Sequence, residues 1–152
     1  MALRKVLKIG DETLRKKSRP VDKIDERLLE LLDDLKETLK KEEGVGIAAP
    51  QVGILRRVIV IDTGDGSGPV EMINPEILEM SGEVESTEGC LSVPNITGKV
   101  IRPEKVKVRA RNREGKLMTY DCQGLFAIVA CHETDHLDGV LFVDKMVEQV
   151  KD

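Results

Sequence analysis

The spacing of apolar residues changes twice along this chain, and that change limits the folds that it can adopt. Five leucines recur at the three- and four-residue steps of an amphipathic helix: Leu28, Leu31, Leu32, Leu35 and Leu39. Between residues 56 and 122 the pattern becomes β-branched runs and alternation of apolar with charged residues, both typical of strands. From about Leu125 the helical spacing returns and continues to His136. The pattern predicts an α+β fold of short, mostly antiparallel strands packed around a long C-terminal helix, with an amphipathic N-terminal helix.

Turn and cap residues set approximate limits to these elements. Asp25 is suited to cap the first helix, while Gly44 and Gly139 are suited to end the first and second helices. The glycine-rich segment 63–68 lacks the lysine of a phosphate-binding loop, and it predicts a hairpin loop. Strands are expected within residues 56–62, 69–86, 105–111 and 116–122, a loop or short extended segment at 45–53, and a helical tail at 143–152.

Length and composition predict one domain over residues 1–152 and exclude several classes of protein. Lys and Arg are spread along a chain of net charge −4, whereas a nucleic-acid binder concentrates its basic residues on one face. No run approaches the roughly 18 apolar residues of a membrane span. The basic N-terminus lacks the apolar core of a signal peptide, so we expect a cytoplasmic protein with no nucleic-acid or membrane partner.

The two histidines of the chain, His132 and His136, lie four residues apart on the apolar stripe of the second predicted helix. Four residues is a little over one turn, so both imidazoles lie on one side of the helix. For a single histidine on an apolar face, the plain interpretation would be a core residue whose hydrogen bonds are satisfied within the protein. The pair, with Glu133 between them, instead resembles the His-Glu-x-x-His pattern that binds a divalent cation.

A catalytic ion of this kind takes three protein ligands and keeps a fourth position open. Cys131 points about 120° from the midline of the two histidines, at 100° per residue. Cys122 precedes His132 by ten residues, and its position is undefined if its segment is a strand. Cys90 occurs in a loop-like segment beside Gly89 and is free to approach the ion. Elimination favours Cys90 without proving it.

Two carboxylates flank the histidine face. Glu133 and Asp135 lie about 80° to either side of the histidine midline, so helix geometry alone does not choose between them. Glu133 fits the zinc-hydrolase pattern in which the glutamate is the general base. Asp135 is expected to support a ligand or to lie on the helix surface.

Three segments resemble, in order, the signature motifs of bacterial peptide deformylases. They are "GVGIAAPQ" (44–51), "EGCLS" (88–92) and "HETDH" (132–136). The flanking "INPEILEMSGEVESTEGCLSVP" and "HETDHLDGVLFVDK" also resemble this family, so the likeness covers nearly the whole chain. It implies a metal-dependent hydrolase that removes the N-formyl group from formyl-methionyl nascent peptides.

The resemblance also implies roles for single residues. Cys90, His132 and His136 would hold one divalent metal ion, Fe(II) in the cell, with Zn, Ni or Co as substitutes. Glu133 would be the general base of the reaction. The oxyanion and the substrate would be contacted by Gln51, the backbone N–H of Leu91, Val45, Gly46, Leu125 and Ile128.

The chain departs from the family pattern at two places. Ser86 occupies a pocket position where apolar residues are common, which affects the depth of the pocket's rim. The tail is short and of mixed charge, so proximity to the ribosome is implied but direct docking is left open. Two other classes are weighed against this hypothesis: a metallopeptidase, whose third ligand is usually histidine or glutamate, and a noncatalytic protein with a closed structural metal site.

Overall fold

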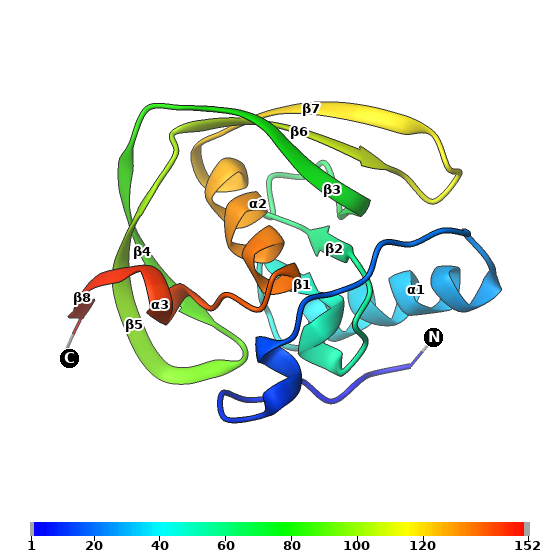
Figure 1. The fold of residues 1–152 in the computed structure, drawn as a ribbon, viewed down its shortest axis with the longest axis horizontal. Helices are drawn as coiled ribbons and strands as arrows, with labels where there is room; N and C mark the ends of the chain where they lie inside the picture. The colour runs from blue at the N-terminus through cyan, green and yellow to red at the C-terminus, as the bar shows by residue number, and fades with distance from the viewer. Residues whose placement is uncertain (1, 151–152) are drawn as a thin grey trace.

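The computed structural model describes residues 2–150 and contains two antiparallel sheets packed around one central helix (Figure 1). The first sheet has the strand order β1-β2-β3-β6-β7, and the second has the order β4-β5-β8. The strands are β1 (Gly46–Ala48), β2 (Val58–Ile61), β3 (Val70–Ser81), β4 (Val84–Cys90), β5 (Val93–Arg102), β6 (Lys105–Arg111), β7 (Leu117–Gln123) and β8 (Met146–Val150). The helices are η1 (Glu12–Arg15), α1 (Glu26–Lys41), η2 (Ala49–Val52), α2 (Gly124–Leu137) and α3 (Phe142–Lys145). The predicted α+β class is confirmed.

Strand β2 shows how the five-stranded sheet is buried on both faces. All four of its residues are fully buried. Because side chains alternate along a strand, Ile59 and Ile61 join the apolar cluster that includes α2, while Val58 and Val60 join the cluster that includes α1. The continuous β-branched run in this part of the sequence therefore reflects a strand with a helix on each side.

Helix α1 begins and ends close to the predicted positions. The Asp25 side chain accepts a hydrogen bond from the Leu28 N–H at 3.0 Å, which satisfies one of the free donors of the first turn. The leucine stripe is buried, and it packs against β1 and β2. The chain then turns into β1, which begins at Gly46 and belongs to the segment predicted as a loop or short extended piece.

Helix α2 lies at the centre of the molecule, enclosed by β1, β2, β7 and the second sheet (Figure 1). It ends at Leu137, and Gly139 follows with a positive φ of 75°. A side chain at Gly139 would also collide with the backbone carbonyl of Arg15. The glycine therefore serves both the turn after the helix and the close passage of the N-terminal segment beneath it.

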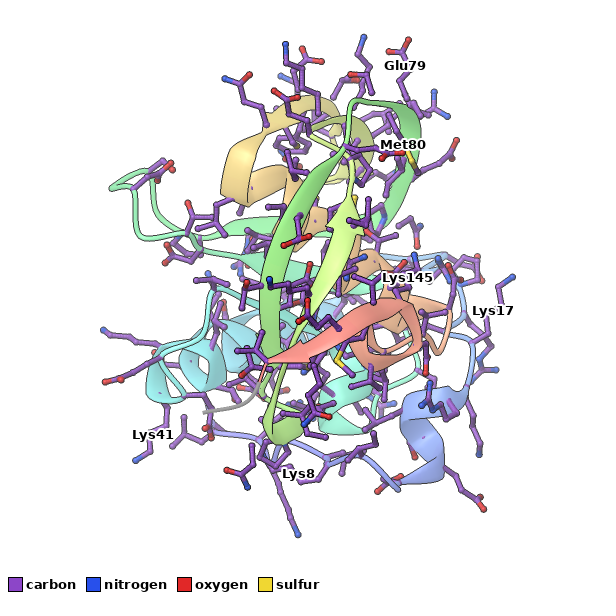
Figure 2. All side chains as sticks on the ribbon, turned by 90° about the vertical axis from the view of Figure 1, so that its left-hand side faces the viewer. Lys8, Lys17, Lys41, Glu79, Met80 and Lys145 are labelled. Atoms are coloured by element: carbon purple, nitrogen blue, oxygen red, sulfur yellow. The ribbon has the colours of Figure 1, made fainter. Side chains whose placement is uncertain are left out.

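The prediction of a helical tail at residues 143–152 is wrong for the residues that the structure describes. Only Phe142–Lys145 form a single helical turn, and Met146–Val150 form strand β8, which pairs antiparallel with β5. Figure 2 faces this three-stranded sheet and shows β8 beside β5. Pairing with a strand some fifty positions earlier overrides the local helical preference of the tail, a tertiary effect that periodicity does not reveal.

The segment around Cys90 is also more regular than expected. Cys90 is the last residue of β4 and pairs with Val93, so Leu91 and Ser92 alone make the turn of a tight hairpin. The hairpin 63–68 is confirmed, because the flanking strands β2 and β3 are paired antiparallel. No helix among residues 2–150 is long and apolar enough to cross a membrane.

Candidate metal centre and active site

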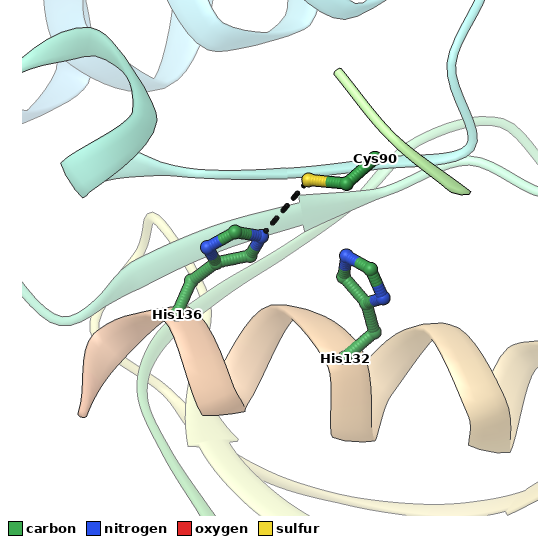
Figure 3. A group of neighbouring side chains, drawn as sticks. All are labelled: Cys90, His132 and His136. Atoms are coloured by element: carbon green, nitrogen blue, oxygen red, sulfur yellow. Dashed lines mark hydrogen bonds between the residues drawn. The ribbon is translucent and has the colours of Figure 1, made fainter. Parts of the chain in front are cut away.

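Helix α2 presents both histidines to one point in the interior. His132 is 8% exposed and His136 is 1% exposed, and their ring centroids are 5.1 Å apart. Both side chains rise from the same face of the helix, as their four-residue spacing predicts (Figure 3). The Nδ1 of His132 contacts Glu88, which leaves its Nε2 facing the opposite side of the ring.

Cys90 approaches the same point from the β4–β5 hairpin. Its Sγ lies 3.4 Å from Nε2 of His136 (Figure 3). The ligand atoms of Cys90, His132 and His136 all lie within 4.8 Å of one another. A shared ion with bonds of about 2.0–2.3 Å separates tetrahedral ligands by about 3.3–3.8 Å, so a small contraction would close this group around one cation.

The other two cysteines are far less suited to this role. Cys122 and Cys131 are both buried in the apolar cluster between α2 and the five-stranded sheet. Burial raises the pKa of each thiol to about 11, which disfavours the thiolate that binds a metal. The structure thus brings together the three residues that elimination and resemblance had selected, and it leaves these two thiols outside the group.

A buried ion-pair network orients His132. Glu88 Oε1 lies 2.9 Å from Nδ1 of His132, and Arg102 donates two hydrogen bonds of 2.8 Å to the same carboxylate. Arg102 also donates to Asp135 at 2.8 Å, and Lys145 reaches Asp135 from outside. Burial alone would raise the pKa of Glu88, but the hydrogen bonds from Arg102 and His132 outweigh it and lower the pKa to about 2. Glu88 is therefore a fixed negative charge behind the histidine.

Sequence reasoning missed the pairing of Glu88 with Arg102. One signal was available: Gly98, Val100 and Arg102 share the inward face of β5, so Arg102 occupies a core-facing position. A charge at such a position requires a buried partner of opposite sign. The identity of that partner depends on the pairing of β4 with β5, which is not written in the local sequence.

The two histidines have opposite pKa shifts. Burial disfavours the charged form of both, but the neighbouring Cys90 and Glu88 side chains outweigh burial at His132 and raise its pKa to about 10. At His136 the charge of His132 adds to the effect of burial, and the pKa falls to about 3. His132 is therefore the histidine of the pair that favours the protonated form.

Glu133 and Asp135, which helix geometry could not tell apart, lie in different surroundings. Glu133 is 4% exposed, and its Oε1 has no hydrogen-bond partner among the described residues. Burial raises the pKa of Glu133 to about 7, although the charge of His132 opposes the shift. Asp135 is paired with Arg102 and Lys145. Glu133 is thus the buried carboxylate with a raised pKa and with an oxygen that has no partner among the described residues.

Gln51 directs its amide nitrogen toward the metal group. Its Oε1 accepts a hydrogen bond from the Ala48 N–H at 2.9 Å, which fixes the orientation of the amide. Its Nε2 then donates to Ser92 Oγ at 3.1 Å and lies 3.6 Å from Cys90 Sγ. The carbonyl of Leu91, next to Cys90, accepts a hydrogen bond from Lys8 Nζ at 2.9 Å, so the N-terminal segment supports the hairpin turn from outside.

A cavity of about 420 Å³ opens beside these groups. Its lining includes the predicted substrate-binding residues Val45, Gly46, Leu125 and Ile128 together with Leu91, Cys90, His132 and Glu133. Val45 and Leu125 are 43% and 51% exposed, so they lie at the mouth rather than in the core. Ser86 also lines the cavity and is buried. The histidine stripe of α2 therefore runs from an open pocket at Leu125 to the closed interior at His136.

Residues 3–152 match the family model described as Polypeptide deformylase. The chain belongs to this family. It is 58% identical over 148 residues to Peptide deformylase 1 of Clostridium acetobutylicum, with 97% of each chain covered. It is 52% identical to a peptide deformylase of Caldicellulosiruptor bescii, over 100% of this chain and 90% of that one.

Solved structures of family members share the whole fold. A peptide deformylase from Legionella pneumophila superposes with a TM-score of 0.92 at 46% identity, covering 95% of this chain and 86% of that one. The enzyme from Thermotoga maritima also gives 0.92, at 41% identity, covering 96% and 99%. This member of the family is a hydrolase that removes the N-formyl group from the N-terminal formyl-methionine of newly made polypeptides, which is the family's known function.

Proposed function

We propose that deformylation takes place at the group formed by Cys90, His132 and His136, which hold one divalent cation. The meeting of these three ligand atoms within 4.8 Å beside an unpartnered buried carboxylate is the observation that carries the proposal. Three protein ligands leave a fourth position for water, as in catalytic rather than structural sites. When bound, the cation lowers the pKa of its water and polarises the formyl oxygen.

Glu133 is the general base in this proposal. Its pKa of about 7 suits a group that takes a proton from water and later gives it to the leaving amine. Its position on α2, one residue from His132, keeps the carboxylate beside the ligands while leaving it outside the ligand set. Glu88 cannot share this task, because Arg102 holds it ionised.

Gln51 and the backbone N–H of Leu91 stabilise the oxyanion that forms on the formyl oxygen. The fixed amide of Gln51 supports this role, because a donor that is already oriented needs no rearrangement during the reaction. Val45, Gly46, Leu125 and Ile128 bind the methionyl residue, and their place in the lining of the cavity supports that assignment.

The cation is Fe(II) in the cell, with Zn, Ni or Co as substitutes. A mixed thiolate and imidazole set suits these metals, whereas Mg and Ca prefer oxygen ligands. The choice of Fe(II) among them rests on the family resemblance. Iron-loaded protein should lose activity in air through oxidation of Fe(II) and of Cys90, and nickel-loaded protein should not. Equal lifetimes of the two forms with and without oxygen would remove the support for iron.

We further propose that residues 1–152 form one domain that acts in the cytoplasm on nascent chains near the ribosome. The apolar clusters join elements from the whole described chain, which supports a single domain. No nucleic acid or membrane is needed for the reaction.

Release of formate from a formyl-Met tripeptide tests the proposal. Protein stripped by a chelator and reloaded with Ni(II) should release one formate for each free amine that appears, without cleavage of a peptide bond. Cleavage between residues would indicate a metallopeptidase. A loaded protein that releases no formate would indicate a site that only holds metal.

A further inference from the structure

Gly46 lies opposite Val129 and Glu133, where strand β1 passes helix α2. A Cβ built on Gly46 would lie 2.6 Å from Val129 Cγ1, 2.7 Å from Glu133 Oε2 and 2.9 Å from Glu133 Cγ. Carbon atoms in ordinary contact are about 3.5–4.0 Å apart. The strand and the helix therefore approach so closely that no side chain larger than hydrogen fits between them.

The backbone itself does not call for glycine at this position. Gly46 is absent from the described residues with positive φ, and it pairs in regular register with Ile61. Its missing side chain is thus explained by the close approach and not by a turn.

The surroundings limit which group can move if a methyl group is added. Val129 is β-branched, so its side chain has one strongly preferred rotamer in a helix, and it is only 4% exposed. Strand β1 is held by its pairing with β2, and its neighbours Ile47 and Ala48 are fully buried. The carboxylate of Glu133 is the end of a longer side chain next to the open cavity. Glu133 is the group that an added Cβ would displace.

We propose that Gly46 is a positioning residue for Glu133: the space left by its missing side chain sets where the carboxylate lies relative to Cys90, His132 and His136. This inference rests on the proposed function, in which Glu133 exchanges a proton with water. Displacement of a reacting group by about 1 Å can cost about 10²-fold in rate. This role is additional to the place of Gly46 in the cavity lining, because it acts through Glu133.

Gly46→Ala tests the inference in Ni(II)-loaded protein. We expect kcat for a formyl-Met tripeptide to fall by about 10²-fold, with KM within about threefold, since the side chains of Val45, Leu125 and Ile128 are unchanged. Metal content should stay at one ion per chain, and the absorption spectrum of the Co(II)-substituted protein should be unchanged, because no ligand is altered. A crystal structure of the variant should show the Glu133 carboxylate displaced.

Val129→Ala supplies a rescue. This substitution removes both Cγ atoms of Val129, so the new Cβ at position 46 can shift away from Glu133. The double variant Gly46→Ala/Val129→Ala should therefore recover about tenfold of the kcat that Gly46→Ala loses. It should still remain about tenfold below Val129→Ala alone, because the contacts with Glu133 persist. If Gly46→Ala does not fold, this last comparison carries the test, and equal kcat values for those two proteins would overturn the inference.

Gly98→Ala is the matched control. Its Cβ would collide with the Met146 side chain, which is unbranched and can move aside, and would lie 3.1 Å from the backbone oxygen of Glu148. Gly98 lies in β5 outside the cavity lining. It should lower the thermal midpoint while leaving kcat within about twofold. A Gly46→Ala protein that keeps wild-type kcat, loses its metal, or changes only KM overturns the inference while the proposed function stands. A metal-loaded wild-type protein that releases no formate would overturn both the inference on Gly46 and the proposed function.

Discussion

Glu88 and Glu133 are both buried carboxylates beside His132, yet the two regions that hold them differ in every partner. Glu88 lies on the β4–β5 side, where Arg102 and His132 satisfy its oxygens and its pKa falls to about 2. Glu133 lies on the side of α2 that faces β1, where one oxygen has no described partner and burial raises the pKa to about 7. Glutamate thus has a lowered pKa at position 88, on the β4–β5 side, and a raised pKa at position 133, on the side that faces β1.

The difference separates the residues that would orient the metal ligands from the residue that would exchange a proton. Glu88 and Arg102, beside the proposed ligand His132, are paired and hydrogen-bonded, so they keep one charge state over a wide range of pH. Glu133, the proposed general base, has one oxygen without a partner among the described residues, and burying such a group is unfavourable. Position in the sequence does not reveal this difference, because Glu133 and Asp135 adjoin proposed metal ligands and Glu88 lies two positions from Cys90.

The largest effect is expected from removing the ligand that lies between the two regions. Cys90→Ala should purify without metal and without measurable deformylation, because two imidazoles alone bind a cation weakly compared with the complete set. Cys122→Ala and Cys131→Ala are the matched controls, and each should keep one ion per chain. Metal analysis of the three proteins decides the assignment. A metal-free Cys131→Ala protein beside a loaded Cys90→Ala protein would reverse it.

Glu133→Gln should separate chemistry from metal binding. Glutamine keeps the size of the side chain but cannot accept a proton from water at neutral pH, so kcat should fall by about 10²- to 10⁴-fold. Metal content should match wild type, since Glu133 is outside the ligand group. Asp135→Asn is the control and should lose at most about 10- to 100-fold through its contact with Arg102. An active Glu133→Gln protein with an inactive Asp135→Asn protein would show that the wrong carboxylate was assigned.

Local features of this chain were predictable because they depend on residues close in sequence. The leucine stripe and Asp25 defined α1, the run Val58–Ile61 defined β2, and the four-residue spacing placed both histidines on one face of α2. The features that the sequence did not predict depend on partners that are far away along the chain. Strand β8 exists because β5 offers an edge, and Arg102 is buried because Glu88 faces it across two paired strands. No period in the sequence reports such pairings.

Glu88 and Glu133 should change stability with pH in opposite directions in the metal-free protein. A carboxyl whose folded pKa lies below its usual 4.5 stabilises the fold above pH 4.5, and that contribution is lost as pH falls toward 2. For Glu133 the folded pKa lies above 4.5, so its contribution is lost as pH rises from 4.5 to 7. Each shift corresponds to roughly 3 kcal/mol.

Denaturant unfolding of chelator-treated protein between pH 2 and 8 measures both contributions. Glu88→Gln should remove the loss of unfolding free energy on the acid side, and Glu133→Gln should remove the loss toward neutral pH. If both variants remove the pH dependence of the unfolding free energy on the same side of the profile, acid or neutral, the pKa values of the two carboxyls are not shifted in opposite directions.

Glu88→Gln should also weaken metal binding without abolishing it. His132 would lose the negative charge that orients its ring and strengthens its bond to a cation, and such changes cost about 10- to 100-fold in metal affinity. Competition with a chelator measures the affinity. At saturating Ni(II) the variant should recover most of its kcat, unlike Glu133→Gln. Wild-type affinity in Glu88→Gln would show that the ion pair serves the fold alone.

The smallest effect concerns the mouth of the cavity, where neither carboxylate acts. Val45, Leu125 and Ile128 offer an apolar slot that is partly open to solvent, so formyl-Met and formyl-norleucine peptides should exceed formyl-Ala peptides in kcat/KM by at least about tenfold. Each buried methylene contributes about 0.8 kcal/mol, and exposure at the mouth reduces that value. Ile128 is more buried than Leu125, so Ile128→Ala should narrow the preference more than Leu125→Ala does. The ratio of kcat/KM values across the three peptides measures this. A flat profile in the wild type would mean that the methionyl side chain binds elsewhere, and Ser86, the buried polar residue of the cavity lining, would be the first position to replace.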